Sequence, residues 1–132
     1  MGAFVALRYQ TDYGEAMGLV LDSPYLSLED LIVKAIKNKI HLPEFVAKEA
    51  LRISKPHLAS KLGFNIECLN GLIQLKNCKH TPVVFVCSKD DELCGKATET
   101  IYENYPGRKK LLYTDRLHNE SREQELLRSC FI

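Results

Sequence analysis

The chain has 132 residues, 45% of them apolar, and a formal net charge of +1 from 18 basic and 17 acidic side chains. This length is enough for one domain with a buried core. The near balance of charge gives no electrostatic reason to expect nucleic acid or an anionic membrane as a partner. No apolar run approaches the roughly 20 residues of a membrane span, so no transmembrane segment is expected.

Cysteine usage and the first residues indicate a reducing compartment. The five cysteines are an odd number without a CxxC pair, which argues against a disulfide framework and against a zinc site. The segment after Met1 lacks the basic region and the cleavage site of a secretory signal peptide. We expect a cytoplasmic protein in which Cys87 is a small buried hydrophobe and Cys94, after an acidic turn, is more exposed. Neither is expected to be a nucleophile.

The beginning of the chain predicts a helix followed by a buried strand. Residues 3–10 are rich in alanine and apolar on all sides, which is typical of a buried helix that begins at or just before Met1. Residues 17–21 form a short, continuous apolar run. Such a run suits a strand covered on both faces, as in a parallel sheet. Periodicity alone does not exclude a helix there, but the short length and the flanking glycine and proline favour a strand.

Residues 27–63 are predicted to be helical. Ser27 begins a variant of the capping box, and apolar residues behind it recur at the spacing of one helical stripe. Pro43 opens a second helix, which we expect to stop at Pro56, because proline lacks an N–H group and restricts the residue before it. A short further helix then ends at Gly63.

The rest of the chain alternates between strands and helices. The complete order is helix, strand, helices, strand, helix, strand, helix, which indicates a parallel α/β sheet with helices on both faces. The remaining elements are a short helix or extended segment at 69–75, a buried strand at 83–87, a helix at 96–105 with Ala97, Ile101 and Tyr105 on one face, a strand at 110–114, and a helix at 121–130 with Leu126, Leu127 and Cys130 inward.

Three polar residues follow the three predicted strands. Asp22, Asp91 and His118 each come just after a strand. In open parallel sheets, active residues lie at the carboxyl ends of the strands. The positions of these side chains therefore predict a functional site at that edge of the sheet.

Several segments, taken in register, carry the motifs of one enzyme family. Residues 82–91 are similar to Pro-x-x-Phe-x-x-Gly-x-x-Asp, with Ser88 where glycine is usual, and residues 102–119 are similar to the stretch that ends in a catalytic histidine. Residues 1–3 are similar to those after the serine in Gly-x-Ser-Met-Gly-Ala, and residues 18–25 to a strand and the loop leaving it. The chain thus resembles the α/β-hydrolase superfamily, in particular serine hydrolases of the serine aminopeptidase-like and acyl-protein thioesterase-like kinds.

The resemblance implies a fold and a site. Residues 1–132 would be the C-terminal part of one α/β-hydrolase domain, with three parallel strands, helices on both faces and a helical lid insertion at about residues 40–64. Asp91 would be the triad acid and His118 the base, in the family's order of acid before base. The N–H of Met1 would be one oxyanion-hole donor. Substrates would be esters, thioesters or amides of a small acyl group or an acylated protein or peptide, without a metal or organic cofactor.

The triad chemistry explains the residue types. A serine hydroxyl becomes a good nucleophile when a neutral imidazole takes its proton, and the carboxylate fixes the tautomer of that imidazole. Asp90 is the alternative acid, but Ser88 in the glycine position favours Asp91. Ser23 lacks the glycines of a nucleophile elbow, and Asp22 is interpreted as a loop-capping residue. We expect surface or lid positions for His41, His57 and His80.

The nucleophile is the part of this triad that the sequence does not supply. A serine is expected directly before Met1, and the chain without it is expected to be inactive by this mechanism. The alternative is a non-catalytic, truncated pseudo-hydrolase that acts as a binding or dimerising module through an uncovered sheet edge. A receiver-like or flavodoxin-like domain is disfavoured, because such folds place their functional acids or phosphate loop early in the chain.

Overall fold

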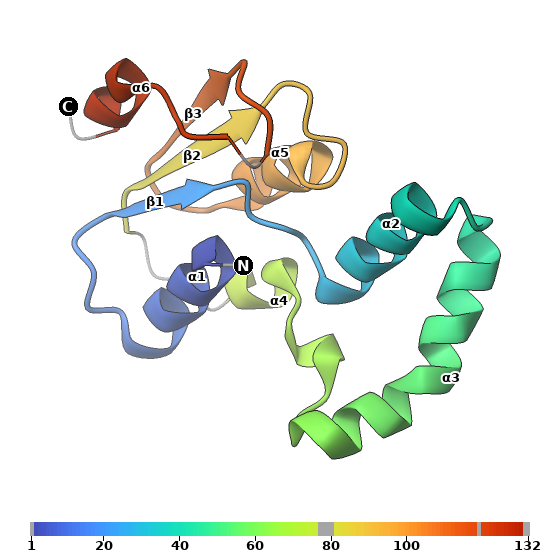
Figure 1. Ribbon diagram of the computed structural model, residues 1–132. Coiled ribbons are helices and arrows are strands. Elements are labelled where there is room, and N and C mark those ends of the chain that lie inside the picture. The colour runs from blue at the N-terminus through green and yellow to red at the C-terminus, as the bar shows by residue number, and fades with distance from the viewer. Residues whose placement is uncertain (1, 77–80, 119, 131–132) are drawn as a thin grey trace.

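The computed structural model describes residues 2–76, 81–118 and 120–130. Strands β1 (Leu19–Asp22), β2 (Val83–Ser88) and β3 (Lys109–Thr114) form a parallel sheet in the order β1-β2-β3 (Figure 1). The predicted α/β fold with three parallel strands is therefore confirmed. The helical elements are α1 (Gly2–Tyr13), α2 (Leu28–Ile40), α3 (Glu44–Leu62), the 3₁₀ helix η1 (Ile66–Cys68), α4 (Gly71–Lys76), α5 (Gly95–Asn104) and α6 (Gln124–Ser129).

Helices cover both faces of the sheet, as predicted. On one face, α1, α4 and α5 enclose the main core, and α6 lies over the opposite face (Figure 1). Register places Leu21 beside Phe85 and Phe85 beside Leu111, so these apolar side chains share the face that the core covers. The buried members of this core are Leu7, Leu21, Leu75, Val83, Phe85, Ile101 and Tyr105.

Helix α6 differs from the prediction, because it contains no buried residue and Leu127 is 44% exposed. The contact of α6 with the sheet is partly polar: the ammonium group of Lys110 on β3 donates to the carbonyl oxygen of Ser129 at 3.4 Å. A lysine on this face of the sheet reduces the apolar surface that α6 can cover. The expected inward set of Leu126, Leu127 and Cys130 is therefore wrong for Leu127, and the other two are only half-buried.

Helix α1 is also less buried than its composition predicts. Phe4, Leu7 and Gln10 recur at a spacing of three residues and face the core, whereas Val5 and Tyr13 are more than half exposed. Gln10 is buried because its amide group is paired: the NH₂ group donates to the Thr81 hydroxyl, and the side-chain oxygen accepts from the N–H of Ala16. The helix has one buried stripe and one exposed apolar stripe.

Helices α2 and α3 project from the sheet as an arm (Figure 1), and the arm is defined here as residues 28–62. The Ser27 hydroxyl accepts from the N–H of Asp30 at 3.0 Å, which confirms the predicted cap. Pro56 does not end a helix, contrary to the prediction: α3 runs continuously through it. One proline removes a single helical hydrogen bond and bends a helix without ending it when both flanks favour helix. Gly63 closes α3 with a left-handed backbone at φ 75°.

The arm has a small core, in which Val33, Ala47 and Leu51 pack with Ile66 of η1. The segment expected to be helical or extended at 69–75 contains α4. Within the described ranges, no helix is both long and apolar enough to cross a membrane.

Candidate active site

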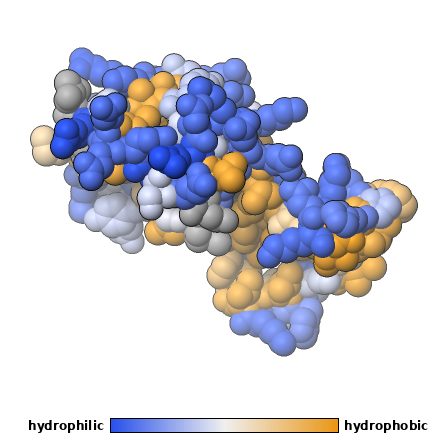
Figure 2. All heavy atoms as spheres, turned by 45° about the horizontal axis from the view of Figure 1, so that its top comes forward, coloured by the Kyte–Doolittle hydropathy of each residue, from blue (hydrophilic) through white to orange (hydrophobic). Residues whose placement is uncertain are grey.

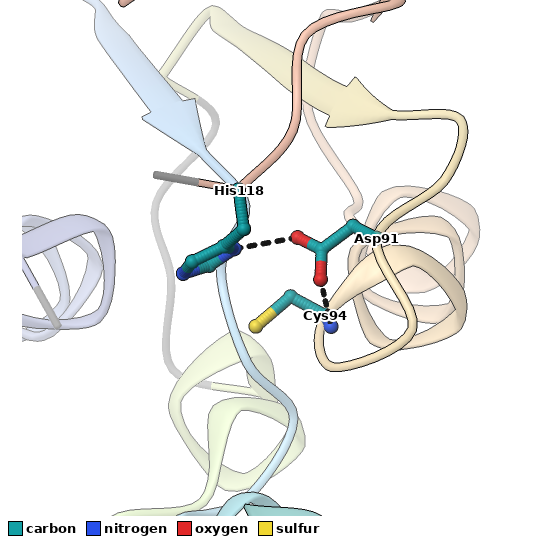
Figure 3. Close-up of side chains that lie close together, drawn as sticks. All are labelled: Asp91, Cys94 and His118. Atoms are coloured by element: carbon teal, nitrogen blue, oxygen red, sulfur yellow. Dashed lines mark hydrogen bonds and ion pairs between the residues drawn. The ribbon is translucent and has the colours of Figure 1, made fainter. Parts of the chain in front are cut away.

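Asp91 and His118 lie together at the carboxyl edge of the sheet. Asp91 follows β2, His118 follows β3, and the Nδ1 atom of His118 is 2.6 Å from the Oδ2 atom of Asp91 (Figure 3). The Asp91 side chain is 1% exposed and that of His118 is 37% exposed. A buried carboxylate thus contacts one ring nitrogen, while the other nitrogen points away from Asp91 (Figure 3).

The second oxygen of Asp91 fixes the carboxylate to the beginning of α5. Oδ1 accepts hydrogen bonds from the N–H groups of Leu93 at 3.0 Å and Cys94 at 2.9 Å. Burial raises the pKa of Asp91, but the hydrogen bonds from His118, Cys94 and Leu93 together outweigh burial and leave this pKa below its usual value. Asp91 is therefore ionised at neutral pH and accepts from an Nδ1–H group of His118.

The structure distinguishes Asp91 from the other candidate residues. Asp90 is exposed, whereas Asp91 is the carboxylate that contacts His118. Ser23 is buried, and within the described residues its hydroxyl group bonds to Asp22 and Arg122 rather than to His118. Two histidines of the arm are exposed: His41 lies in the turn between α2 and α3, and His57 lies in α3. Met1 and His80 lie outside the described residues.

Ser88, which stands where the Pro-x-x-Phe-x-x-Gly-x-x-Asp pattern has glycine, connects β2 to the loop that follows β3. It is the last residue of β2 and is 1% exposed, and its hydroxyl donates to the carbonyl oxygen of Arg116 at 2.6 Å. Arg116 lies two residues before His118. The serine side chain therefore bonds directly to the loop that carries the histidine.

Cys94 lies beside the pair and, contrary to the prediction, is only 2% exposed. Burial and the neighbouring Asp91 carboxylate raise the pKa of its thiol to about 11. The ligand atoms of Asp91, Cys94 and His118 lie within 4.8 Å of one another, which is a possible metal-ligand set. Both Asp91 oxygens are already hydrogen-bonded, however, so a metal ion would have to displace those contacts. The geometry favours a hydrogen-bonded acid–base pair over a metal centre.

The first turn of α1 lies next to this pair. Phe4 stacks on Tyr25 with ring centroids 4.9 Å apart, and both pack in one cluster with Cys94. The beginning of α1 is therefore held close to the site by buried apolar contacts.

Comparisons with known proteins support the fold. An acetyl xylan esterase from Paenibacillus sp. R4 superposes with a TM-score of 0.64 at 17% identity, over 98% of this chain and 41% of the esterase. Acetyl xylan esterase 1 from Thermoanaerobacterium sp. JW/SL YS485 gives 0.63 at 17% identity, over 97% and 41%. An esterase from Pyrococcus furiosus gives 0.57 at 24% identity, over 88% and 42%.

This chain shares the fold of these esterases and spans about two fifths of their length. At this level of identity the likeness concerns the fold alone. Neither a protein-family model nor a curated protein matches the sequence.

Arg122 is a residue of the site region that the sequence patterns did not indicate. It lies four residues after His118, and its guanidinium binds the carboxylate of Asp22, 100 residues earlier in the chain, at 2.7 Å. Asp22 was expected to cap a loop and instead forms this ion pair. An arginine in a polar segment carries no local pattern that names such a distant partner.

Proposed function

We propose that this chain carries the acid and the base of a serine hydrolase that cleaves ester, thioester or amide bonds. The observation that carries the proposal is the 2.6 Å contact between His118 Nδ1 and the buried Asp91 carboxylate, at the carboxyl edge of a parallel sheet. The fold shared with three esterases supports ester hydrolysis as the first activity to test.

In the proposed mechanism, His118 moves the proton. Its Nε2 atom accepts the proton of a serine hydroxyl as the oxygen attacks the substrate carbonyl, and then returns that proton to the leaving group. Asp91 accepts from Nδ1–H throughout, fixes this tautomer and stabilises the imidazolium. Water then attacks the acyl-enzyme by the same route, and the acid is released.

We propose further that the serine directly precedes Met1 in the native polypeptide, so that residues 1–132 are the C-terminal part of the hydrolase domain. The resemblance of residues 1–3 to the nucleophile elbow supports this, as does the first turn of α1, where Phe4 packs in a cluster with Cys94 beside the pair. The N–H of Met1 would then be an oxyanion-hole donor. The described cysteines are unpaired, which supports a cytoplasmic location.

Residues 40–64 would form the lid over an acyl-binding site. A cavity of about 400 Å³ lies where α2 and the beginning of α3 approach α5 and the loop after Asp91, and Leu31, Leu93 and Ala97 are among its lining residues. These three residues give the cavity one apolar side, which suits a small acyl group, while charged side chains such as Lys34, Glu44 and Lys96 line the rest. Neither Asp91 nor His118 lines this cavity, so we propose that it binds the acyl chain rather than the scissile bond.

The experiment is ester hydrolysis by the native full-length polypeptide, with p-nitrophenyl acetate as substrate. We expect Asp91→Asn to lower kcat by about 1,000- to 10,000-fold, because the histidine loses the carboxylate that fixes its tautomer. His118→Gln should lower it at least as much. Asp90→Asn is the matched control and should retain activity, because Asp90 is exposed next to the proposed acid. A fluorophosphonate probe should label a serine, and mass spectrometry should locate it.

Equal activity of the Asp91→Asn and Asp90→Asn variants would contradict the proposal. So would the absence of both ester hydrolysis and fluorophosphonate labelling in the unmodified polypeptide. Thioesters and amides are tested in the same way once the nucleophile is located.

The exposed stripe on α1 supports a second candidate, a binding or dimerising module. Val5, Tyr9 and Tyr13 recur at a spacing of four residues and are 59%, 47% and 62% exposed, and Val20 on the edge strand β1 is 39% exposed. An apolar stripe beside a strand edge is a surface for association. Sedimentation velocity of the native polypeptide tests it: a dimer that Tyr9→Lys converts to a monomer supports the module, and a monomer at all concentrations excludes dimerisation.

A further inference from the structure

The loop that carries His118 has little apolar packing to hold it in place. His118 lies four residues beyond the end of β3, Leu117 beside it is 53% exposed, and α6 after the loop contains no buried residue. A catalytic side chain must be held within about 0.5 Å of its productive position. Since burial does not fix this loop, polar contacts must do so.

Two buried groups reach the carbonyl oxygens just before His118. One is the hydroxyl of Ser88, which donates to Arg116, and the other is the guanidinium of Arg122. The Nε and Nη2 atoms of Arg122 donate to the two carboxylate oxygens of Asp22, at 2.7 and 2.8 Å. Its Nη1 atom donates to the carbonyl oxygens of Leu117 at 3.0 Å and Arg116 at 3.3 Å. The Arg122 side chain is 8% exposed. A planar guanidinium in a two-point contact fixes direction as well as distance, which the point charge of a lysine does not.

Asp22 is a fixed point for this contact, because it belongs to the sheet. It is the last residue of β1 and pairs in register with Val86 on β2. The residue after it is fixed too: the N–H of Ser23 donates to the carbonyl oxygen of Val86 at 2.9 Å, and its hydroxyl donates to Asp22 Oδ1 at 3.0 Å. The carboxylate is thus oriented from both sides.

We propose that Asp22 and Arg122 are positioning residues that hold His118 against Asp91. The contacts form a closed path: the end of β1 holds Asp22, Asp22 holds Arg122, and Arg122 holds the two carbonyl groups that precede His118. His118 in turn contacts Asp91, which follows β2. The consequence for catalysis rests on the proposed function, but the positioning itself is measurable without any substrate.

The first test is the Nδ1 proton of His118, observed by NMR in the native full-length polypeptide. A hydrogen bond to a buried carboxylate shifts such a proton far downfield and slows its exchange with water. We expect Arg122→Ala to abolish the resonance, Arg122→Lys to retain part of its intensity, and Asp22→Asn to increase its exchange rate. Lys89→Ala is the matched control: Lys89 holds Asp115 of the same loop through an exposed pair at 2.6 Å, and its loss should leave the resonance unchanged.

An unchanged resonance in folded Arg122→Ala would overturn the proposal. If that variant does not fold, Asp22→Asn decides, because it keeps the size of the side chain and leaves Arg122 its carbonyl contacts. Faster exchange in Asp22→Asn supports positioning, and unchanged exchange contradicts it.

The second test separates positioning from a general structural role. With an ester substrate, we expect Arg122→Ala to lower kcat by about 100-fold while KM stays near its original value, since a histidine displaced by about 1 Å loses proton transfer rather than substrate binding. The pKa of Asp91 should rise, because the hydrogen bond from His118 helps to lower it. A fall in kcat together with an equally large rise in KM, and an unchanged Nδ1 resonance, would contradict positioning. An unmodified polypeptide that neither hydrolyses the ester nor reacts with the fluorophosphonate would contradict the proposed function and leave the NMR test intact.

Discussion

The sheet and the arm are stabilised to very different extents. In the sheet region, Phe85, Leu21 and Ile101 are completely buried in one continuous core. In the arm, the core is a small cluster that includes Leu51, while Phe45 and Ile53 are 74% and 69% exposed. Figure 2 shows hydrophobic residues gathered over the arm, whereas the visible face of the sheet region is mostly hydrophilic. The candidate site is therefore built on the better-packed region.

The two regions also differ in some of their charged contacts. The contacts of Lys48 with Glu44 and of Arg52 with Glu49 lie on the surface of α3, with at least half of each side chain exposed. Exposed pairs of this kind contribute little to stability, because water and salt screen them. In the site, the Asp91 carboxylate is buried and fully hydrogen-bonded. Polar contacts fix the position of the Asp91 carboxylate in the site. In the arm, the more buried pair is that of Lys55 with Glu29, at 2.7 Å, which joins α3 to α2.

The largest expected effect on the free energy of unfolding is at the centre of the sheet. Phe85→Ala removes a completely buried ring that contacts Tyr102 and Tyr105 edge-on. We expect the free energy of unfolding to fall by about 3–5 kcal/mol. Phe45→Ala is the matched control in the arm and should change it by about 0.5 kcal/mol or less. Urea unfolding measures both, and similar losses would show that the two regions do not differ as described.

A smaller and local effect is expected in the arm. Leu51→Ala opens the cluster of Val33, Ala47 and Ile66, and should cost about 2 kcal/mol, near the lower end for such changes, because the arm can relax around the gap. Hydrogen exchange should accelerate in α2 and α3 while the amides of β2 stay protected. Equal acceleration in β2 would indicate that arm and sheet unfold as one cooperative unit.

The sequence predicted what depends on local pattern. Continuous apolar runs indicated the strands, their alternation with helices indicated a parallel sheet, and the ends of those strands placed Asp91 and His118 at one edge. The cap at Ser27 was also correct, because its hydrogen bond reaches only three residues along the chain. The contact between Asp91 and His118 follows from the fold, and their catalytic roles stay predictions.

The features that the sequence did not predict depend on long-range packing. Pro56 looked like a helix end because the effect of proline is local, yet α3 continues through it. Cys94 looked exposed beside acidic residues, but Phe4 and Tyr25, which are distant in sequence, cover it. The pair of Asp22 with Arg122 spans 100 residues, and no spacing rule connects them.

The smallest expected effect is on the alkylation of the Cys94 thiol, and it tests whether the packing around this residue keeps solvent out. Cys94 is buried and the pKa of its thiol is about 11, whereas Cys68, in the η1 segment after the arm, is exposed. Alkylation requires the thiolate and access to it. With iodoacetamide at pH 8, we expect Cys68 to be modified and Cys94 to stay almost unmodified until urea unfolds the sheet. Equal rates at the two cysteines under native conditions would mean that the cluster of Phe4, Tyr25 and Cys94 opens readily, and that α1 is not held beside the acid–base pair.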